Sequence, residues 1–330
     1  MAPRPRRVTA SDVAREAKVG KTTVSYVLNA TPNQTIPEHT RQRVLDAAAR
    51  LRYTPMSAAR ALRKGRNDMV LAILPDWPLA RVVSLILEHL SDELETHGLS
   101  LIIRRVPSRH ALGQTWRELV PAAVVAFGDI DDDEREAMRA DGLFVANVFR
   151  GLNASHGDAL FLPQEEIGAI QARHLAGRGH KAIGYAAPLD DHLGVGVLRA
   201  RGARQVCAEL GLRDLDVAVM EPSIGSATET ATHWRQSGVT AVAAFNDEIA
   251  MALLAGLREV GLRTPQDVAV MGVDNEPMSA FAFPPLTTVD VNTSMMAEYI
   301  AGAVMAGIEG EPHAPVVASK AISLLIRDSA

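Results

Sequence analysis

The chain contains a single cysteine, Cys207, in 330 residues, so no disulfide can form within it. This is typical of proteins from a reducing compartment. No run of 18 apolar residues occurs, and the sequence therefore predicts no membrane-spanning helix. The basic start, MAPRPRR, leads into a polar segment instead of the apolar stretch of a secretory signal. These absences favour a cytoplasmic protein without a membrane partner.

The motifs of nucleotide-dependent and metal-dependent enzymes are also missing. After the first predicted strand the sequence reads LAILPDWP, where a Walker-type phosphate loop or a Gly-rich dinucleotide turn would stand. The histidines lack the spacing of metal ligands; they include His89, His97, His174, His180 and His233. We expect no cofactor, no metal and no catalytic residue. Parallel α/β sheets do support many enzymes, so an α/β enzyme is kept as an alternative.

Positive charge is concentrated at one end of the chain. Residues 1–66 contain 14 Lys and Arg against 4 Asp and Glu, a net charge of +10, whereas residues 67–330 carry 20 against 35, a net charge of −15. A small basic region can bind nucleic-acid phosphates, because neutralising phosphates releases condensed counterions. A solvated basic surface is the alternative that charge alone leaves open.

The segment VTASDVAREAKVGKTTVSYVLN, residues 8–29, has the pattern of two short helices joined by a tight turn. Its start fits a capping box, in which the Thr9 hydroxyl accepts from a first-turn amide and Asp12 reaches back. Gly20 can serve as N-cap of the second helix, and a third helix is expected from Pro37, a favoured first helical residue. Polar side chains face outward near the start of the second helix: Lys21, Thr22, Ser25 and Tyr26. Such a helix is suited to reading base edges in the major groove.

From Val8 through Leu62 the chain resembles the lac-repressor-type (LacI/GalR) family of bacterial transcription regulators. The resemblance is carried by VTASDVAREAKVGKTTVSYVLN, TRQRVLDAAARLRYTP and SAARALRKGR. It implies a helix-turn-helix head over residues 1–54 and a hinge helix over 55–66, whose leucine, here Leu62, enters the DNA minor groove. An apolar wedge between base steps unstacks them and bends the duplex. An ordinary core leucine is the alternative for Leu62.

The same resemblance implies DNA contacts by position. They are Thr9, Ser11, Lys21, Thr22, Thr23, Ser25, Tyr26, Asn29, Ser57, Ala58, Ala59, Leu62 and Arg63. The chain departs from the family pattern at four positions, where Gly, Ser, Arg and Asn are usual: Lys18, Gly20, Tyr26 and Met56. None of these departures opposes the fold. Base choice rests on side chains such as Lys21 and Tyr26, so the operator sequence stays open.

After residue 66, short apolar runs alternate with segments of helical periodicity. The runs MVLAIL, LSLIIRRV, AAVVAF, LFVANVF, KAIGYAA, DVAVM, VTAVAAF and DVAVMGVD read as buried strands. Repeated strand–helix units predict parallel sheets covered on both faces, and two series of them predict two doubly wound α/β subdomains. Ligands bind such folds at the carboxyl ends of the strands.

The family resemblance extends to about Arg327 through GRGHKAIGY, LRARGA, FNDEIAMALLAGL, GLRTPQDVAVMGVDN and FPPLTTVDVN. It implies the two-lobed fold of periplasmic sugar-binding proteins, with three crossovers between lobes. We expect an effector-binding and dimerisation core over residues 67–330. Its N-subdomain is expected at about 67–157 and 286–314, and its C-subdomain at about 158–285 and 315–330.

Candidate effector-binding residues follow from the same resemblance, each where a strand end opens into the expected cleft. They are Asp76, Trp77, Arg150, Arg199, Asn246, Asp247 and Asp274. Carboxylate and guanidinium groups there can bind ligand hydroxyls or a ligand carboxylate. A helix cap or an interlobe salt bridge is the structural alternative for each of these residues.

The expected pocket departs from the sugar-binding pattern. The sequence WPLA follows Asp76 where the family commonly has Asn-Pro-Phe-Phe, Phe149 stands in place of an Asp, and Gln164-Glu165 replace an Asp-Asn pair. Trp77 can stack on a ligand ring or pack between lobes. The loss of two polar contacts predicts an effector with fewer hydroxyls than a hexose.

The resemblance implies a sequence-specific transcription regulator, and we expect a repressor at the bacterial nucleoid. Two heads would bind a pseudo-palindromic operator, which requires a homodimer, or a higher oligomer, matched to the DNA two-fold axis. A small-molecule effector in the cleft would change operator affinity. A ligand-dependent activator or a corepressor-type regulator is an alternative. A secreted solute-binding protein shares the core but not the basic head.

Overall fold

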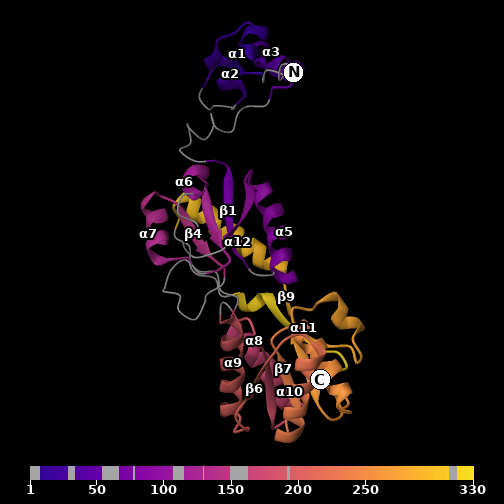
Figure 1. The fold of residues 1–330 in the computed structure, drawn as a ribbon. Coiled ribbons are helices and arrows are strands. Elements are labelled where there is room, and N and C mark those ends of the chain that lie inside the picture. The colour runs from indigo at the N-terminus through magenta and orange to yellow at the C-terminus, as the bar shows by residue number, and fades with distance from the viewer. Residues whose placement is uncertain are drawn as a thin grey trace, which may run out of the picture. The chain divides into compact units, whose positions relative to one another are not determined.

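The computed structural model describes residues 8–28, 34–53, 67–76, 79–106, 115–128, 130–148, 163–191, 194–311 and 318–330. The chain divides into two compact units, Met1–Asp68 and Met69–Ala330, which we call the head and the core (Figure 1). Within these described ranges, no helix is long and apolar enough to cross a membrane.

The described part of the head contains helices α1 (Ala10–Glu16), α2 (Lys21–Leu28) and α3 (Glu38–Arg50). One valine from each helix is fully buried in a shared apolar cluster: Val13, Val24 and Val44. Arg43 of α3 also donates to the Ala17 carbonyl at 3.0 Å, which ties α3 to the end of α1. Pro37 is the N-cap of α3, one position earlier than the first helical position expected for it.

The core begins with a four-stranded parallel sheet in the order β2-β1-β3-β4. The strands are β1 (Met69–Pro75), β2 (Ser100–Val106), β3 (Ala123–Ala126) and β4 (Phe144–Asn147). The accompanying helices are α5 (Arg81–Thr96), α6 (Thr115–Leu119) and α7 (Asp132–Ala140). Val70, Ala72 and Leu74 of β1 pack in one apolar cluster, and Leu71 and Ile73 pack in another. This explains why a central parallel strand is a continuous apolar run.

A second sheet has six strands in the order β10-β9-β8-β7-β5-β6. These are β5 (Ile183–Pro188), β6 (Asp216–Met220), β7 (Ala241–Ala244), β8 (Ala269–Val273), β9 (Thr287–Val291) and β10 (Ile322–Leu325). Helices α8 (Gln164–Gly177), α9 (Val195–Glu209), α10 (Ile224–Ser237) and α11 (Asp247–Glu259) belong to the same lobe, as do the 3₁₀ turns η1 (Pro277–Phe281) and η2 (Ala318–Ala321). The predicted architecture of two doubly wound α/β subdomains is confirmed. Among the described strands, only β10 is antiparallel to its neighbour, β9.

One expected subdomain boundary is wrong. The chain was expected to return to the first lobe at residue 286, but β9 pairs with both β8 and β10 and so belongs to the six-stranded sheet. The return follows β9, where helix α12 (Thr293–Glu309) packs against α5, β3 and β4 (Figure 1). A strand with a neighbour on each side has its backbone N–H and C=O groups hydrogen-bonded along both edges, and this pairing keeps β9 in the six-stranded sheet. Pro285 therefore does not mark the crossover. The other expected boundaries lie in or beside segments outside the described residues.

Candidate functional site

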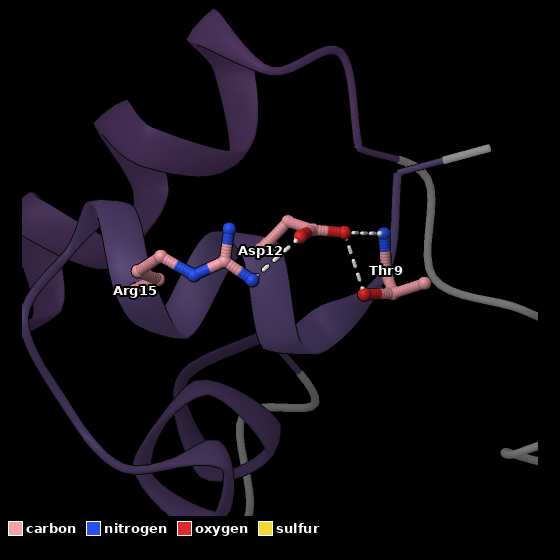
Figure 2. Close-up of polar contacts among 3 residues, drawn as sticks. All are labelled: Thr9, Asp12 and Arg15. Atoms are coloured by element: carbon pink, nitrogen blue, oxygen red, sulfur yellow. Dashed lines mark hydrogen bonds and ion pairs between the residues drawn. The ribbon is translucent and has the colours of Figure 1, made fainter. Parts of the chain in front are cut away.

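Asp12 organises the start of α1 (Figure 2). Its Oδ2 accepts hydrogen bonds from the Thr9 backbone N–H at 2.9 Å and from the Thr9 hydroxyl at 2.7 Å, while Oδ1 accepts from Arg15 Nη2 at 3.1 Å. The predicted capping box is present. The cap therefore fixes Thr9, a predicted DNA contact, at the beginning of the helix.

The turn between α1 and α2 has a left-handed residue. Lys18 has a φ of +52°, a region that favours glycine, which accounts for the Gly usual at this position in the family pattern. The carbonyl of Gly20 accepts the Val24 N–H at 3.1 Å, which is the bond expected of a residue at the N-cap. The turn thus fixes the position at which α2 begins.

Helix α2 presents a polar face and a buried one. Val24 and Val27 are buried, whereas Lys21, Thr22 and Ser25 are exposed. Thr23 and Tyr26 are half-buried on α2, as is Ser11 on α1. No acidic residue lies on α2, so nothing on this helix opposes a phosphate backbone. The predicted recognition face is therefore exposed at its first turn.

Several predicted site residues lie outside the described residues. In the head and hinge they are Asn29, Ser57, Ala58, Ala59, Leu62 and Arg63, and in the core they are Trp77 and Arg150. Their assignments remain predictions from the sequence.

Arg199 is the buried cation of the second lobe. Its side chain lies on α9 with only 5% of the residue exposed, and Nε donates to Gln164 Oε1 at 2.8 Å. Nη1 donates to the Phe245 carbonyl, and the guanidinium carbon lies 4.8 Å from the centroid of the Phe245 ring. Nη2 has no hydrogen-bond partner among the described residues. Arg199 is therefore held firmly while part of its donor set stays available for a ligand.

Two glycines allow α8 and α9 to touch closely enough for this arrangement. A Cβ on Gly168 of α8 would overlap the Arg199 carbonyl, and one on Gly202 of α9 would overlap the Glu165 carbonyl. This backbone contact brings Gln164 and Arg199 together. Gln164 was interpreted from the sequence as part of a lost polar pair, yet it is a direct partner of Arg199.

Asp274 follows the carboxyl end of β8 in a strained conformation. Its φ is +96°, and that of the next residue, Asn275, is +48°. Burial raises the pKa of the Asp274 carboxyl, and the positive charge of Arg199 opposes that rise. No described residue makes a hydrogen bond to this half-buried carboxyl. Strain of this kind costs free energy and is common at ligand sites.

Asp247 is fully buried and bonded within the protein. Its Oδ2 accepts from the Glu276 N–H at 2.7 Å, and its Oδ1 accepts from the Thr288 hydroxyl at 2.7 Å. Burial raises the pKa of Asp247 to about 7 against the effect of these two donors. A Cβ on Gly272 would overlap the same carboxyl. These contacts make Asp247 a link between β7, β8 and β9 in this structure.

The remaining two candidates have local partners. Asn246 is the N-cap of α11, and its side chain accepts from the Ile249 N–H at 2.9 Å. Asp76, at the end of β1 in the other lobe, is exposed and pairs with Arg105 Nη2 at 3.2 Å. The structure therefore brings Arg199 and Asp274 within electrostatic range. Asn246 is the helix cap that was its alternative, whereas Asp247 is neither a cap nor part of a salt bridge but accepts two hydrogen bonds inside the lobe.

Comparisons with known proteins agree with this organisation. Residues 9–56 match the model for bacterial regulatory proteins of the lacI family, and residues 172–330 match the periplasmic binding protein-like domain. The HTH-type transcriptional repressor PurR of Photobacterium profundum is 27% identical, covering 97% of this chain and 98% of the relative. The chain therefore combines a lacI-type helix-turn-helix domain with a periplasmic binding protein-like domain.

Solved structures of transcription regulators share the fold. The lac repressor dimer bound to operator and the anti-inducer ONPF has a TM-score of 0.83 at 21% identity, covering 98% of this chain and 99% of that one. The transcriptional regulator CelR–cellobiose complex has a TM-score of 0.69 at 25% identity, covering 98% and 100%. With its lacI-type head match and its similarity to transcriptional repressors over nearly its full length, this chain is a DNA-binding transcriptional regulator.

The candidate residues chosen from the sequence omit three residues that shape this site. Asn275 and Thr288 bond around the strand ends of β8 and β9, and Tyr185 on β5 has a buried hydroxyl without a hydrogen-bond partner in the described ranges. Burial raises the pKa of Tyr185, with Arg199 opposing, so the phenol stays neutral. The motif GVDN did mark Asn275, but nothing in the sequence identified its partners.

Proposed function

We propose that this regulator is a repressor that binds a pseudo-palindromic operator as a homodimer and responds to a small-molecule effector held by its core. The observation that carries the proposal is the exposed polar face of α2 within a basic head. Lys21, Thr22 and Ser25 lie together on that face, and residues 1–66 carry a net charge of +10. Such a head acts at the bacterial nucleoid in the cytoplasm.

Selection of bound duplexes from random DNA tests the operator. The full-length protein is expected to enrich a sequence with two-fold symmetry, because two identical heads match a DNA two-fold axis. Repeating the selection with and without cell metabolites gives the sign of the effector. Failure to enrich any sequence at low and moderate salt would refute sequence-specific binding.

Leu62→Ala tests the predicted minor-groove wedge. We expect a strong loss of specific operator affinity and little loss of nonspecific, salt-sensitive binding, since phosphate contacts supply the latter. Equal loss of both would show that Leu62 acts as an ordinary core residue.

Two exposed apolar surfaces of the core support the homodimer. The η1 patch comprises Met278, Phe281 and Phe283, which are 62%, 79% and 90% exposed. In the other lobe, Ile102 and Ile103 are exposed on the edge strand β2. Clusters of exposed apolar side chains mark interaction surfaces, and a second copy of the chain is the partner that paired operator half-sites require.

Sedimentation equilibrium of a Phe281→Asp/Phe283→Asp variant tests the η1 patch. A desolvated charge at a self-complementary interface is strongly unfavourable, so the variant is expected to be monomeric. The control Leu189→Asp changes an apolar residue that is 57% exposed outside the patch. An unchanged dimer in the double variant would rule out this surface, and dimer loss in the control would remove the specificity of the result.

Arg199 and Asp274 support an effector that carries both an acceptor and a donor. Guanidinium donors of Arg199 suit a carbonyl or carboxylate, and the Asp274 carboxyl suits a hydroxyl or amine. The departures around Asp76 favour a ligand with fewer hydroxyls than a hexose. Isothermal titration against a metabolite panel tests this. Tight binding of a common hexose, abolished by Asp274→Ala, would contradict it.

We take repression with effector-induced release as the leading mode. An effector that favours one lobe arrangement changes operator affinity, and the operator must change effector affinity by the same factor. Gel shifts of the selected operator with the titrated metabolite decide the mode. Tighter operator binding with the metabolite would instead establish the corepressor-type alternative.

A further inference from the structure

Asn275 connects three segments that are far apart in the sequence. Its Nδ2 donates to Asp290 Oδ1 on β9 at 3.0 Å, and its Oδ1 accepts from Arg327 Nη2 at 2.7 Å. A carboxylate only accepts and a guanidinium only donates, so these two partners fix which way the amide faces. The backbone N–H of Asn275 also donates to Thr288 Oγ1 on β9 at 3.4 Å.

The backbone around Asn275 is bonded at each step. The Asp274 N–H donates to the Val289 carbonyl at 2.8 Å, and the Glu276 N–H donates to Asp247 Oδ2 at 2.7 Å. These contacts hold Asp274 and Asn275 in their left-handed conformations, at φ values of +96° and +48°. Because strained residues persist only where their surroundings fix them, the direction of the Asp274 side chain depends on the position of β9.

Strand β9 is joined directly to the other lobe. Asp290 stands two residues before Asn292, the N-cap of α12, and α12 packs against α5, β3 and β4. A shift of β9 is therefore delivered to α12 across a very short connection. Arg327 extends the same network, since its Nη1 donates to Ser279 Oγ of η1 at 3.0 Å.

We propose that Asn275 is a positioning residue that couples the state of Asp274 to β9 and, through β9, to α12. The functional significance of this coupling rests on the proposed effector role of Asp274, whereas the coupling itself is a property of the protein without a ligand. An amide is required at this position. A carboxylate would retain the bond to Arg327 but would face the Asp290 carboxylate without a donor.

A double-mutant cycle read by hydrogen–deuterium exchange tests the proposal on the full-length protein without a ligand. Asp274→Asn removes the ionisable carboxyl that lies within electrostatic range of Arg199, and it serves as the perturbation at the candidate site. Exchange of the amides in residues 287–296 is the readout. The cycle is run with Asn275 intact, with Asn275→Asp, and with the swap Asn275→Asp/Asp290→Asn, in which the introduced amide donates to the introduced carboxylate.

Asn275→Asp is expected to raise exchange rates along β9 about tenfold, the factor of roughly one hydrogen bond. The swap is expected to restore most of that protection. In the background with Asn275 intact and in the swap background, Asp274→Asn should change the exchange rates of β9 at least about threefold. In the Asn275→Asp background it should leave these rates unchanged. The control Ser323→Ala lies opposite Asp290 on β10 and should change neither result.

The proposal is overturned if Asn275→Asp leaves β9 exchange unchanged, if the swap fails to restore it, or if Asp274→Asn acts equally in all backgrounds. Should Asn275→Asp unfold the sheet, seen as lost protection in β6, Asp290→Ala removes the same bond from the β9 side and is judged by the same criteria. A metabolite screen without binders would refute the effector role of Asp274 and leave this cycle unaffected. If an effector is confirmed but the cycle shows no coupling, only the proposed role of Asn275 is refuted.

Discussion

Replacing the buried carboxyl of Asp247 by an amide is expected to remove a large part of the pH dependence of core stability below pH 7. Asp247 is fully buried, with two donors, the Glu276 N–H and the Thr288 hydroxyl. Asp247→Asn keeps the shape. Its amide oxygen can accept from Glu276, and its Nδ2 can donate to the Thr288 hydroxyl, which is able to accept.

The magnitude follows from the pKa of Asp247, which burial raises from 3.8 to about 7. Because the folded-state pKa is raised, the stability contributed by the protonated form is fully present below the unfolded pKa and is lost as the pH rises through about 7. Each unit of pKa shift corresponds to 1.36 kcal/mol, so the full effect is at most about 4 kcal/mol between pH 4 and pH 7.

Urea denaturation of the core at half-unit steps from pH 5 to pH 8 measures the effect. Relative to Asp247→Asn, the wild type should lose about 1.4 kcal/mol of unfolding free energy per pH unit up to pH 7 and then level off. Taking the difference cancels other titrations, such as that of His180, whose pKa burial lowers. The control Asp328→Asn changes an exposed carboxyl. Parallel curves for wild type and Asp247→Asn would refute the burial argument.

Three further substitutions test the packing and capping described above. Thr9→Ala removes the cap hydroxyl of α1 and is expected to cost the head about 1 kcal/mol, measured as faster amide exchange in α1, while Thr9→Ser retains protection. Lys18→Gly relieves the left-handed residue and should stabilise the head by about 0.5–1 kcal/mol in a thermal melt; a lower melting temperature would contradict this. Gly202→Ala forces α9 away from the Glu165 carbonyl and should destabilise the core by about 3 kcal/mol in urea. Gly225→Ala, whose added Cβ meets nothing within 4 Å, should leave the core stable or slightly more so, and equal losses would refute the helix-contact explanation.

Elements that are determined by residues close together in the sequence could be predicted from the sequence. MVLAIL predicted β1 because a parallel strand covered on both faces needs apolar residues throughout. The TASD start predicted the α1 cap because the bonds involved join residues only three positions apart. The LRARGA motif also contains Gly202, which the structure places at the close contact between α8 and α9.

Long-range partners could not be predicted in the same way. The boundary at residue 286 was taken from the family resemblance, and nothing in TTVDV says which sheet this segment joins, so β9 was expected in the wrong lobe. Asp247 was expected as a cap or ligand contact, because a helix start after a strand supports both. Its actual donors come from Glu276 and Thr288, which lie 29 and 41 residues further along the chain. Such contacts are determined by tertiary packing, on which one sequence carries no direct signal.

The Thr288 hydroxyl joins the two networks that these experiments probe. It donates to Asp247 Oδ1 at 2.7 Å and accepts from the Asn275 N–H at 3.4 Å, and the Thr288 residue is fully buried. Any movement of Asn275 therefore affects the Thr288 hydroxyl that donates to the Asp247 carboxyl. In the same way, ionisation of Asp247 affects the hydroxyl that accepts the Asn275 N–H. Linkage then requires that a ligand acting through Asn275 change the protonation of Asp247, and that pH near 7 change the affinity for that ligand by the same free energy.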